Sequence, residues 1–147
     1  MKYSVRVADY NDLPWILDDA GVKMIQEEVK QPELYNRSTM ANIVIAAIEK
    51  ETVFIGTSDE QPVGVIGGVV VPHYLNAEKT TLAEIMWYVY PEYRETRVGI
   101  FMLKKYAERA KDFDYATFSL LAGSPISDRT LERYGFHLKE RSFLMEN

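Results

Sequence analysis

The sequence predicts one α/β domain in which helices flank a mixed, mostly antiparallel sheet. The chain has 147 residues, of which 47% are hydrophobic, and this is enough to bury the core of one domain. Segments with the two-residue period of strands alternate with segments that have the 3.6-residue period of helices. No internal repeat or Gly/Ser-rich linker divides the chain. We therefore assign residues 1–147 to a single domain.

The first third of the chain predicts a strand followed by two helices. Residues 4–8 alternate apolar and polar side chains, which indicates a strand. Asn11 or Asp12 is placed to cap a first helix, and Ser38 or Thr39 is placed to cap a second. The residues between the two helices form a loop or a bent helix pair.

The middle of the chain predicts a β-hairpin. Residues 53–55 form a short strand, and a turn follows at 59–62. Residues 63–71 are so rich in valine and isoleucine that we expect a central strand buried on both faces.

The last third predicts a strand–helix–strand crossover and two smaller elements. A strand at 80–90 leads through a helix at 99–111 to a strand at 115–121, and such a connection makes the two strands parallel. A short helix follows at 127–134, and alternation over 136–145 predicts a last strand or a tight hairpin.

Composition and charge exclude several classes of function. The chain has no cysteine and only two histidines, so we expect no thiolate chemistry and no metal. Its net charge is −5 with scattered basic residues, which argues against a nucleic acid partner. It has neither a membrane-length apolar run nor a signal-like start, so we expect a soluble, cytoplasmic protein.

Residues 87–100 carry the most informative pattern, because a strand there ends at Pro91, passes through a basic loop and enters a helix. The first turn of a helix presents unpaired N–H groups and the positive end of the helix dipole. Arg94 and Arg97 would add positive charge, so the segment predicts a site for a pyrophosphate. The N–H groups would come from Val98, Gly99 and Ile100.

This segment resembles the acetyl-CoA-binding motif of the GNAT acetyltransferases. In that family strand four ends in a Val-x-Pro-x-Tyr-Arg pattern, which Val89, Pro91, Tyr93 and Arg94 match, and x-x-Gly-x-Gly follows, whose second glycine matches Gly99. The order of elements is similar over nearly the whole chain. The resemblance implies a GNAT-like fold in which parallel strands four and five splay apart.

The resemblance also implies which residues bind acetyl-CoA. The pantetheine arm would lie along strand four, with Val89 aligning the thioester, and the loop before the helix would hold the phosphates. Arg97 stands where the family has its first glycine, and its guanidinium could contact a phosphate directly. The implied coenzyme-binding residues are Tyr88, Val89, Tyr90, Arg94, Thr96, Arg97, Val98, Gly99 and Ile100.

Two candidate catalytic residues follow from the same resemblance. Glu84 is similar to a strand-four glutamate that serves as general base, although it lies one residue out of step relative to Val89, so a β-bulge is needed to place it on the same face. Residues 131–136 resemble a Tyr-x-x-x-Gly-Phe segment of the family. Leu131 replaces its tyrosine, which leaves Tyr134 as the candidate general acid.

Together these features predict an N-acetyltransferase that transfers an acetyl group from acetyl-CoA directly to an amine in a ternary complex. The acceptor would be a small molecule or a protein, bordered by residues 28–36 and 72–80. The resemblance implies a homodimer as one option. Two alternatives stay open: a GNAT-like binding or regulatory module without turnover, which Arg97 and Leu131 would allow, and a site for another phosphate ligand such as a nucleotide.

Overall fold

The computed structural model describes residues 1–147 and confirms the predicted class of fold. The chain forms one five-stranded sheet in the order β1-β2-β3-β4-β5. Neighbouring strands are antiparallel except β4 and β5, which are parallel. The strands are β1 (Tyr3–Val7), β2 (Val53–Ser58), β3 (Gln61–His73), β4 (Asn76–Val89) and β5 (Tyr115–Thr117).

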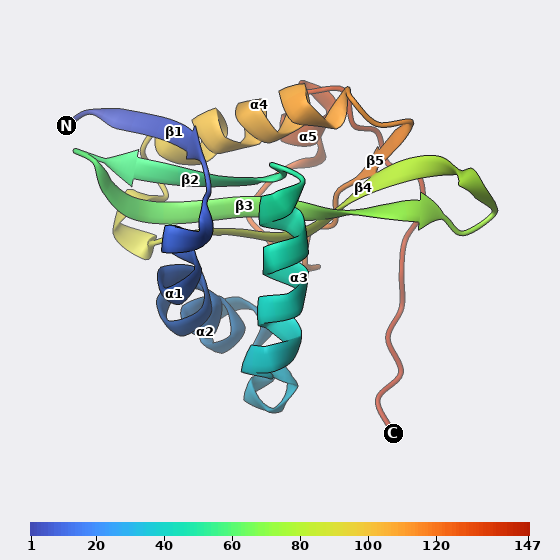
Figure 1. Cartoon of the computed structure of the whole chain (residues 1–147), viewed down its shortest axis with the longest axis horizontal. Coiled ribbons are helices and arrows are strands. Elements are labelled where there is room, and N and C mark those ends of the chain that lie inside the picture. The colour runs from blue at the N-terminus through green and yellow to red at the C-terminus, as the bar shows by residue number, and fades with distance from the viewer.

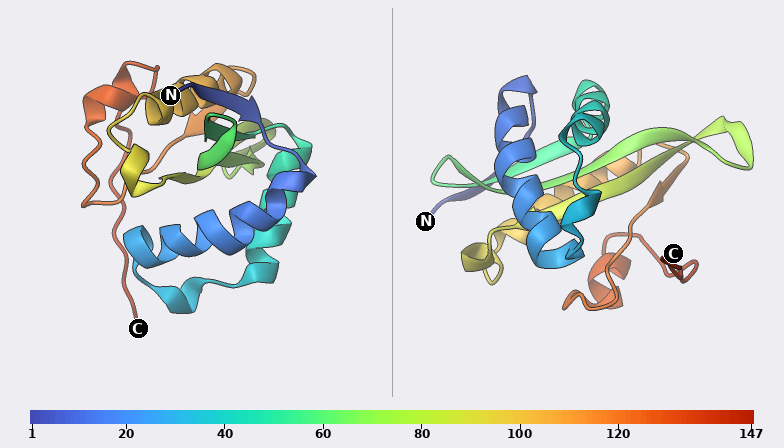
Figure 2. Two further views of the ribbon diagram at one scale, coloured as in Figure 1. Left: turned by 90° about the vertical axis from the view of Figure 1, so that its left-hand side faces the viewer. Right: turned by 90° about the horizontal axis from the view of Figure 1, so that it is seen from below.

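Two helical layers cover the sheet (Figure 1, Figure 2). One face carries α4 (Val98–Ala110), and the other carries α3 (Arg37–Glu49) and a continuous helical run. That run comprises η1 (Tyr10–Asp12), α1 (Leu13–Trp15), η2 (Ile16–Ala20), α2 (Gly21–Met24) and η3 (Ile25–Val29). The remaining turns are η4 (Pro32–Leu34), η5 (Pro91–Tyr93) and α5 (Asp128–Glu132). No helix has the length and apolar character needed to cross a membrane.

The core has one cluster on each face of the sheet, and β3 contributes to both. Val65 packs with the helices η2 and α3, and Ile66 packs with α4. Because successive side chains of a strand point to opposite faces, a strand covered on both sides needs apolar residues throughout. Residues 63–68 are all buried, which confirms the prediction of a central strand.

Two helix caps lie upstream of the residues predicted for them. Asp9 caps the first turn in a reciprocal arrangement with Asp12, which lies inside that turn. The side chain of Asn36 accepts the Thr39 N–H at 2.9 Å and so caps α3. Several polar residues compete at each helix start, and the chain direction before the helix decides between them.

The predictions for the C-terminal end are partly wrong. β5 ends at Thr117 instead of residue 121, and no strand forms over residues 136–145. Residues 137–147 make no hydrogen bond within the chain, and this segment runs away from the sheet (Figure 1). An alternating pattern forms a strand only where a neighbouring strand offers an edge for hydrogen bonding. Here β5 pairs with β4 over only three residues, and residues 136–145 do not pair with either strand.

Candidate functional site

A gap opens in the sheet where β5 leaves β4. The two strands pair only between residues 81–83 and 115–117. Beyond this point β4 continues alongside β3 as far as Val89. The edge of β4 from Glu84 to Val89 therefore has no strand neighbour on the β5 side. The GNAT resemblance implied this divergence of strands four and five.

The main chain of Val89 faces this gap. The Tyr90 N–H donates to the Val63 carbonyl at 2.9 Å, so Tyr90 belongs to a hydrogen-bonded pair with β3. Bonded and non-bonded pairs alternate in an antiparallel ladder, so Val89 turns its N–H and C=O away from β3 while Tyr88 faces it. Of the three residues predicted along the pantetheine arm, Val89 alone directs its main chain into the gap.

The side chains of Tyr88 and Tyr90 instead tie β4 to the helical run beneath it. The Tyr88 hydroxyl donates to Glu27 at 2.7 Å, and the Tyr90 hydroxyl donates to Asp19 at 2.6 Å. Burial, reinforced by these carboxylates, raises the pKa of both phenols. Their hydroxyls are therefore fixed donors that hold the strand in place.

A β-bulge places Glu84 on the same face of the sheet as Val89. Gly67 pairs with Met86 but Gly68 pairs with Glu84, so Ile85 is an extra residue in β4. The sequence offset between Glu84 and Val89 required such a bulge if both residues were to share a face. Val89 packs in the cluster on the α4 side, and Glu84 lies on that side through its pairing with Gly68.

Glu84 is the carboxyl whose proton affinity is most altered at this gap. Burial raises its pKa from 4.5 to about 7, the backbone N–H of Ser119 acts in the opposite direction, and the charge of Glu28 adds to the increase. The Ser119 N–H donates to Glu84 Oε1 at 3.2 Å, across the point where β5 departs. A carboxyl with a pKa near 7 can both accept and release a proton at neutral pH.

The start of α4 leaves three backbone donors free. Arg97, Gly99 and Ile100 have no acceptor for their N–H groups within the chain, whereas the Thr96 N–H donates to the Tyr93 carbonyl at 3.1 Å. The Val98 N–H has only a long contact of 3.4 Å to the Thr96 hydroxyl. The free donors lie at the positive end of a 13-residue helix.

The one departure from the glycine pattern, Arg97, does not distort this loop. Arg97 has φ −75° and ψ −13°, a conformation open to any residue, so no glycine is required there. A Cβ added to Gly99 would meet only Val89, at 3.8 Å. Gly99 therefore keeps open the space between the helix start and the free edge of β4.

Arg94 does not point toward the helix start in this structure. Its Nε donates to the Val89 carbonyl at 2.8 Å, and its Nη2 lies 3.1 Å from Glu27 and 3.8 Å from Glu28. Arg94 thus connects β4 to η3. Sequence reasoning missed Glu27 and Glu28, because nothing in their local pattern indicates that η3 lies beneath the end of β4.

The remaining candidate catalytic residue is Tyr134. Tyr134 and Leu131 pack against the α4-side core, and no hydrogen bond joins Tyr134 to Glu84. His73 lies at the far end of β3, with its ring centroid 5.2 Å from that of Tyr115. The role of Tyr134 as general acid stays a prediction.

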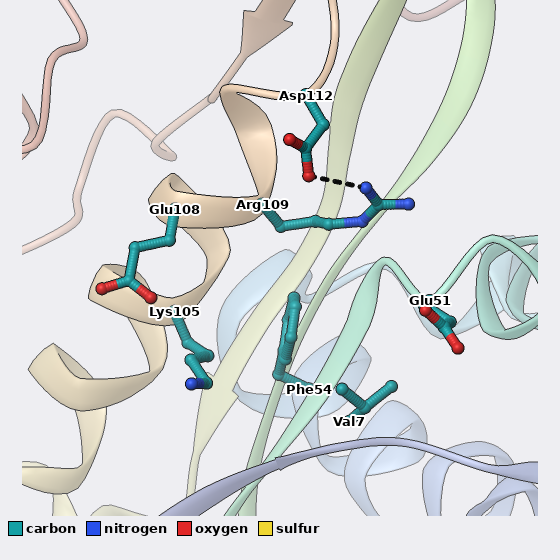
Figure 3. A pocket seen from close by; sticks show the side chains of 7 residues that line it. All are labelled: Val7, Glu51, Phe54, Lys105, Glu108, Arg109 and Asp112. Carbon is teal, nitrogen blue, oxygen red and sulfur yellow. Dashed lines mark hydrogen bonds and ion pairs between the residues drawn. The ribbon is translucent and has the colours of Figure 1, made fainter.

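One surface cavity is separate from this site. It measures about 370 Å³ and lies between α4 and the strands β1 and β2 (Figure 3). Two of the charged residues that line it form an ion pair, in which Arg109 Nη1 lies 2.8 Å from Asp112 Oδ2. None of the predicted site residues lines it. No group of three or more His, Asp or Glu residues is arranged to hold a metal ion.

A parallel pair of strands that separates beside a helix start agrees with the fold that the motif at residues 87–100 implied. The sequence profile described as the acetyltransferase (GNAT) family matches residues 22–136. The chain belongs to the GNAT acetyltransferase family, whose members carry out acyl transfer. No curated protein sequence matches it.

Solved structures support the same fold over the full length. A predicted acetyltransferase from Clostridium acetobutylicum, solved with acetyl-CoA, has a TM-score of 0.73 at 15% identity and covers 99% of this chain and 96% of its own. A transcriptional regulator from Bacillus halodurans has a TM-score of 0.68 at 16% identity, and the match covers 99% of this chain and 100% of the regulator. An aminoglycoside acetyltransferase from an uncultured soil metagenomic sample, solved with sisomicin, has a TM-score of 0.66 at 12% identity. The match covers 99% of this chain and 95% of that enzyme. At these identities the likeness establishes the fold alone.

Proposed function

We propose that this protein is an N-acetyltransferase that moves an acetyl group from acetyl-CoA to an amine by direct transfer in a ternary complex. The main support is one arrangement: the free edge of β4 at Val89 lies beside the open space at Gly99. A ligand with an amide-containing arm and a pyrophosphate needs both features. The acetyl-CoA bound to the Clostridium acetobutylicum protein of similar fold agrees with this choice.

The residues of the chain divide the work of binding. The Val89 N–H is available to pair with the pantetheine arm, while Arg94 occupies the Val89 carbonyl until the arm replaces it. The free N–H groups of Arg97, Gly99 and Ile100 suit a pyrophosphate. Arg97 makes no ion pair within the chain, so its charge is available to the same group.

Glu84 is the proposed general base. Acetyl-CoA supplies the acyl group as a thioester, and the acceptor nitrogen attacks the carbonyl carbon. The neutral amine forms a C–N bond, the C–S bond breaks, and the surplus proton on nitrogen passes to Glu84, directly or through water. That proton then returns through solvent water to the coenzyme thiolate, so Glu84 is ionised again at the end of the cycle. Because the coenzyme thiolate is a tolerable leaving group, this scheme does not require a tyrosine at the position of Leu131.

The charges around the gap favour a cationic acceptor. Glu27 and Glu28 lie beneath the end of β4, where Arg94 contacts both, and the charge of Glu28 also acts on Glu84. An amine that is protonated in solution would be attracted to these carboxylates, and it would release one proton to solvent water before the neutral nitrogen attacks. We therefore propose an amine-bearing small molecule or a protein side chain as acceptor.

Calorimetric titration with acetyl-CoA tests the coenzyme part of this proposal. Gly99→Glu should abolish binding, because the new side chain fills the space beside Val89 and places a negative charge at the phosphate position. Gly123→Glu is the matched control, since nothing lies within 4 Å of that glycine. We expect micromolar binding in the wild type and the control. Absence of binding, or equal binding of ATP, would contradict the proposal.

A catalytically inactive binding or regulatory module is the second candidate. It is favoured by the replacement of the family tyrosine at Leu131 and by the absence of any hydrogen bond between Tyr134 and Glu84. An assay of the free thiol that forms from acetyl-CoA when each amine of a panel is added distinguishes the two candidates. Coenzyme binding without thiol release from any amine would support the binding module.

A further inference from the structure

Tyr106 carries a polar group that the fold buries without a partner. The residue lies on the inner face of α4 and is fully buried. Its ring contacts Phe118 edge-on, with centroids 5.7 Å apart. Its hydroxyl has no hydrogen-bond partner in the chain. Packing alone would be served better by phenylalanine, because an unpaired buried hydroxyl reduces stability.

Gly68 makes room for this hydroxyl. A Cβ at Gly68 would lie 2.4 Å from the Tyr106 hydroxyl oxygen and 2.8 Å from the carbonyl oxygen of Ala83. Both contacts are shorter than real Cβ atoms show, and the second is to backbone. The Tyr106 hydroxyl therefore occupies the space that a side chain at position 68 would need.

The partner of Gly68 across the sheet is Glu84. The two residues form a cross-strand pair at the bulge, and the members of such a pair point to the same face with Cβ positions about 5 Å apart. Since the missing Cβ of Gly68 points at the Tyr106 hydroxyl, that hydroxyl and the Glu84 side chain lie on one face as neighbours. The negative charge of Glu84 also raises the pKa of Tyr106, after the larger effect of burial.

We propose that Tyr106 is a positioning residue for Glu84: the Tyr106 hydroxyl donates a hydrogen bond to one water molecule, which in turn donates to the ionised Glu84 carboxylate. Ordered water commonly satisfies buried polar groups of this kind. Together with the Ser119 N–H, this donor would hold the carboxylate toward the gap. The catalytic meaning of this contact rests on the proposed function. The contact between Tyr106 and Glu84 itself can be measured without acetyl-CoA or an acceptor.

The charged and polar groups that face Glu84 come from three elements. Glu28 of η3 disfavours the ionised form, and the Ser119 N–H after β5 favours it. Tyr106 of α4 would favour it as a further donor. Removing the Tyr106 hydroxyl should therefore make Glu84 a weaker acid, whereas a purely structural hydroxyl would leave the ionisation of Glu84 unchanged.

The test is an NMR titration of the glutamate side-chain carboxyls in the full chain, with the Glu84 signal assigned by its loss in Glu84→Gln. We expect Tyr106→Phe to lower the acid dissociation constant of Glu84 roughly tenfold. Tyr3→Phe is the matched control, because Tyr3 packs against the same core cluster from β1, at the opposite edge of the sheet. Phenylalanine keeps the ring that packs against Phe118 and removes an unpaired buried hydroxyl, so Tyr106→Phe is expected to fold.

An unchanged Glu84 titration in folded Tyr106→Phe would overturn the proposal, and so would an equal change in Tyr3→Phe. Acetyl-CoA binding, measured separately by calorimetry on the wild type, decides the proposed function. If the coenzyme does not bind but Tyr106→Phe shifts Glu84, the proposed function fails and the pairing stands. If the coenzyme binds and the Glu84 titration is the same in Tyr106→Phe as in the wild type, the contact between Tyr106 and Glu84 is refuted and the proposed function stands.

Discussion

At the scale of single residues, the ionisation of Glu84 is the property that most directly links structure to chemistry. Its pKa of about 7 results first from burial, which penalises the charged form. The same burial has a cost for the protein, because folding must exclude the carboxylate from water as the pH rises. The proton-transfer role that we propose for Glu84 would therefore be obtained at the expense of stability at neutral pH.

This cost predicts a pH-dependent stability difference. The folded-state pKa of Glu84 is above its ordinary value of 4.5, so the folded chain binds more protons than the unfolded chain between about pH 4.5 and 7. The Glu84 contribution is fully present below that range and is lost as the pH rises through it. The loss is on the order of 3 kcal/mol.

Urea unfolding of the wild type and Glu84→Gln measures this difference. The variant should match the wild type near pH 4.5 and exceed its free energy of unfolding at pH 8, because glutamine keeps the neutral state. The exposed Glu92→Gln serves as control, and it should show no such divergence. A constant difference between Glu84→Gln and the wild type at both pH values would show that Glu84 does not titrate as the structure indicates.

At the scale of elements, the bulge in β4 and the turn after α3 meet at Gly68. Thr52 is fully buried, and its hydroxyl lies 3.0 Å from the Ala47 carbonyl and 2.6 Å from the Gly68 carbonyl. The Gly68 N–H donates to the Thr52 carbonyl at 3.1 Å. The end of α3 thus fixes the strand segment that faces Glu84 and Tyr106.

Replacement of Thr52 by valine tests this connection between elements. Valine keeps the shape of the side chain but removes the hydroxyl, so we expect a loss of about 1–3 kcal/mol in the free energy of unfolding. Thr117→Val is the control, because Thr117 is exposed on β5 and its side chain makes no hydrogen bond. Equal stability of the two variants in urea would mean that the Thr52 hydroxyl contributes little.

At the scale of the whole molecule, the sheet is closed on both faces by helices but ends abruptly beyond β5. The segment after α5 contains exposed apolar side chains, among them Phe143 at 87% and Met145 at 79% exposure. Residues 137–147 have no hydrogen bond to the rest of the chain. The body of the domain is therefore complete without them.

Amide hydrogen exchange distinguishes this arrangement from the strand that the sequence pattern predicted. The backbone amides of residues 137–147 should exchange at the rate of an unstructured peptide, while those of β3 should require global unfolding. Protection of alternate amides over residues 138–145 would instead reveal a paired strand. The β3 amides provide the internal control in the same experiment.

The sequence by itself determined the class of fold, the order of most elements and the place of the loop for which we propose phosphate binding. These follow from local periodicity and from one contiguous motif at residues 87–100, which need no knowledge of distant contacts. Only the tertiary structure decided the bulge at Ile85, the contact of Arg94 with Glu27 and the burial of Tyr106 against Gly68. Each of these joins residues far apart in the chain or depends on the register of two strands. The last strand was predicted wrongly for the same reason, because alternation specifies a face but not the neighbour that a strand needs.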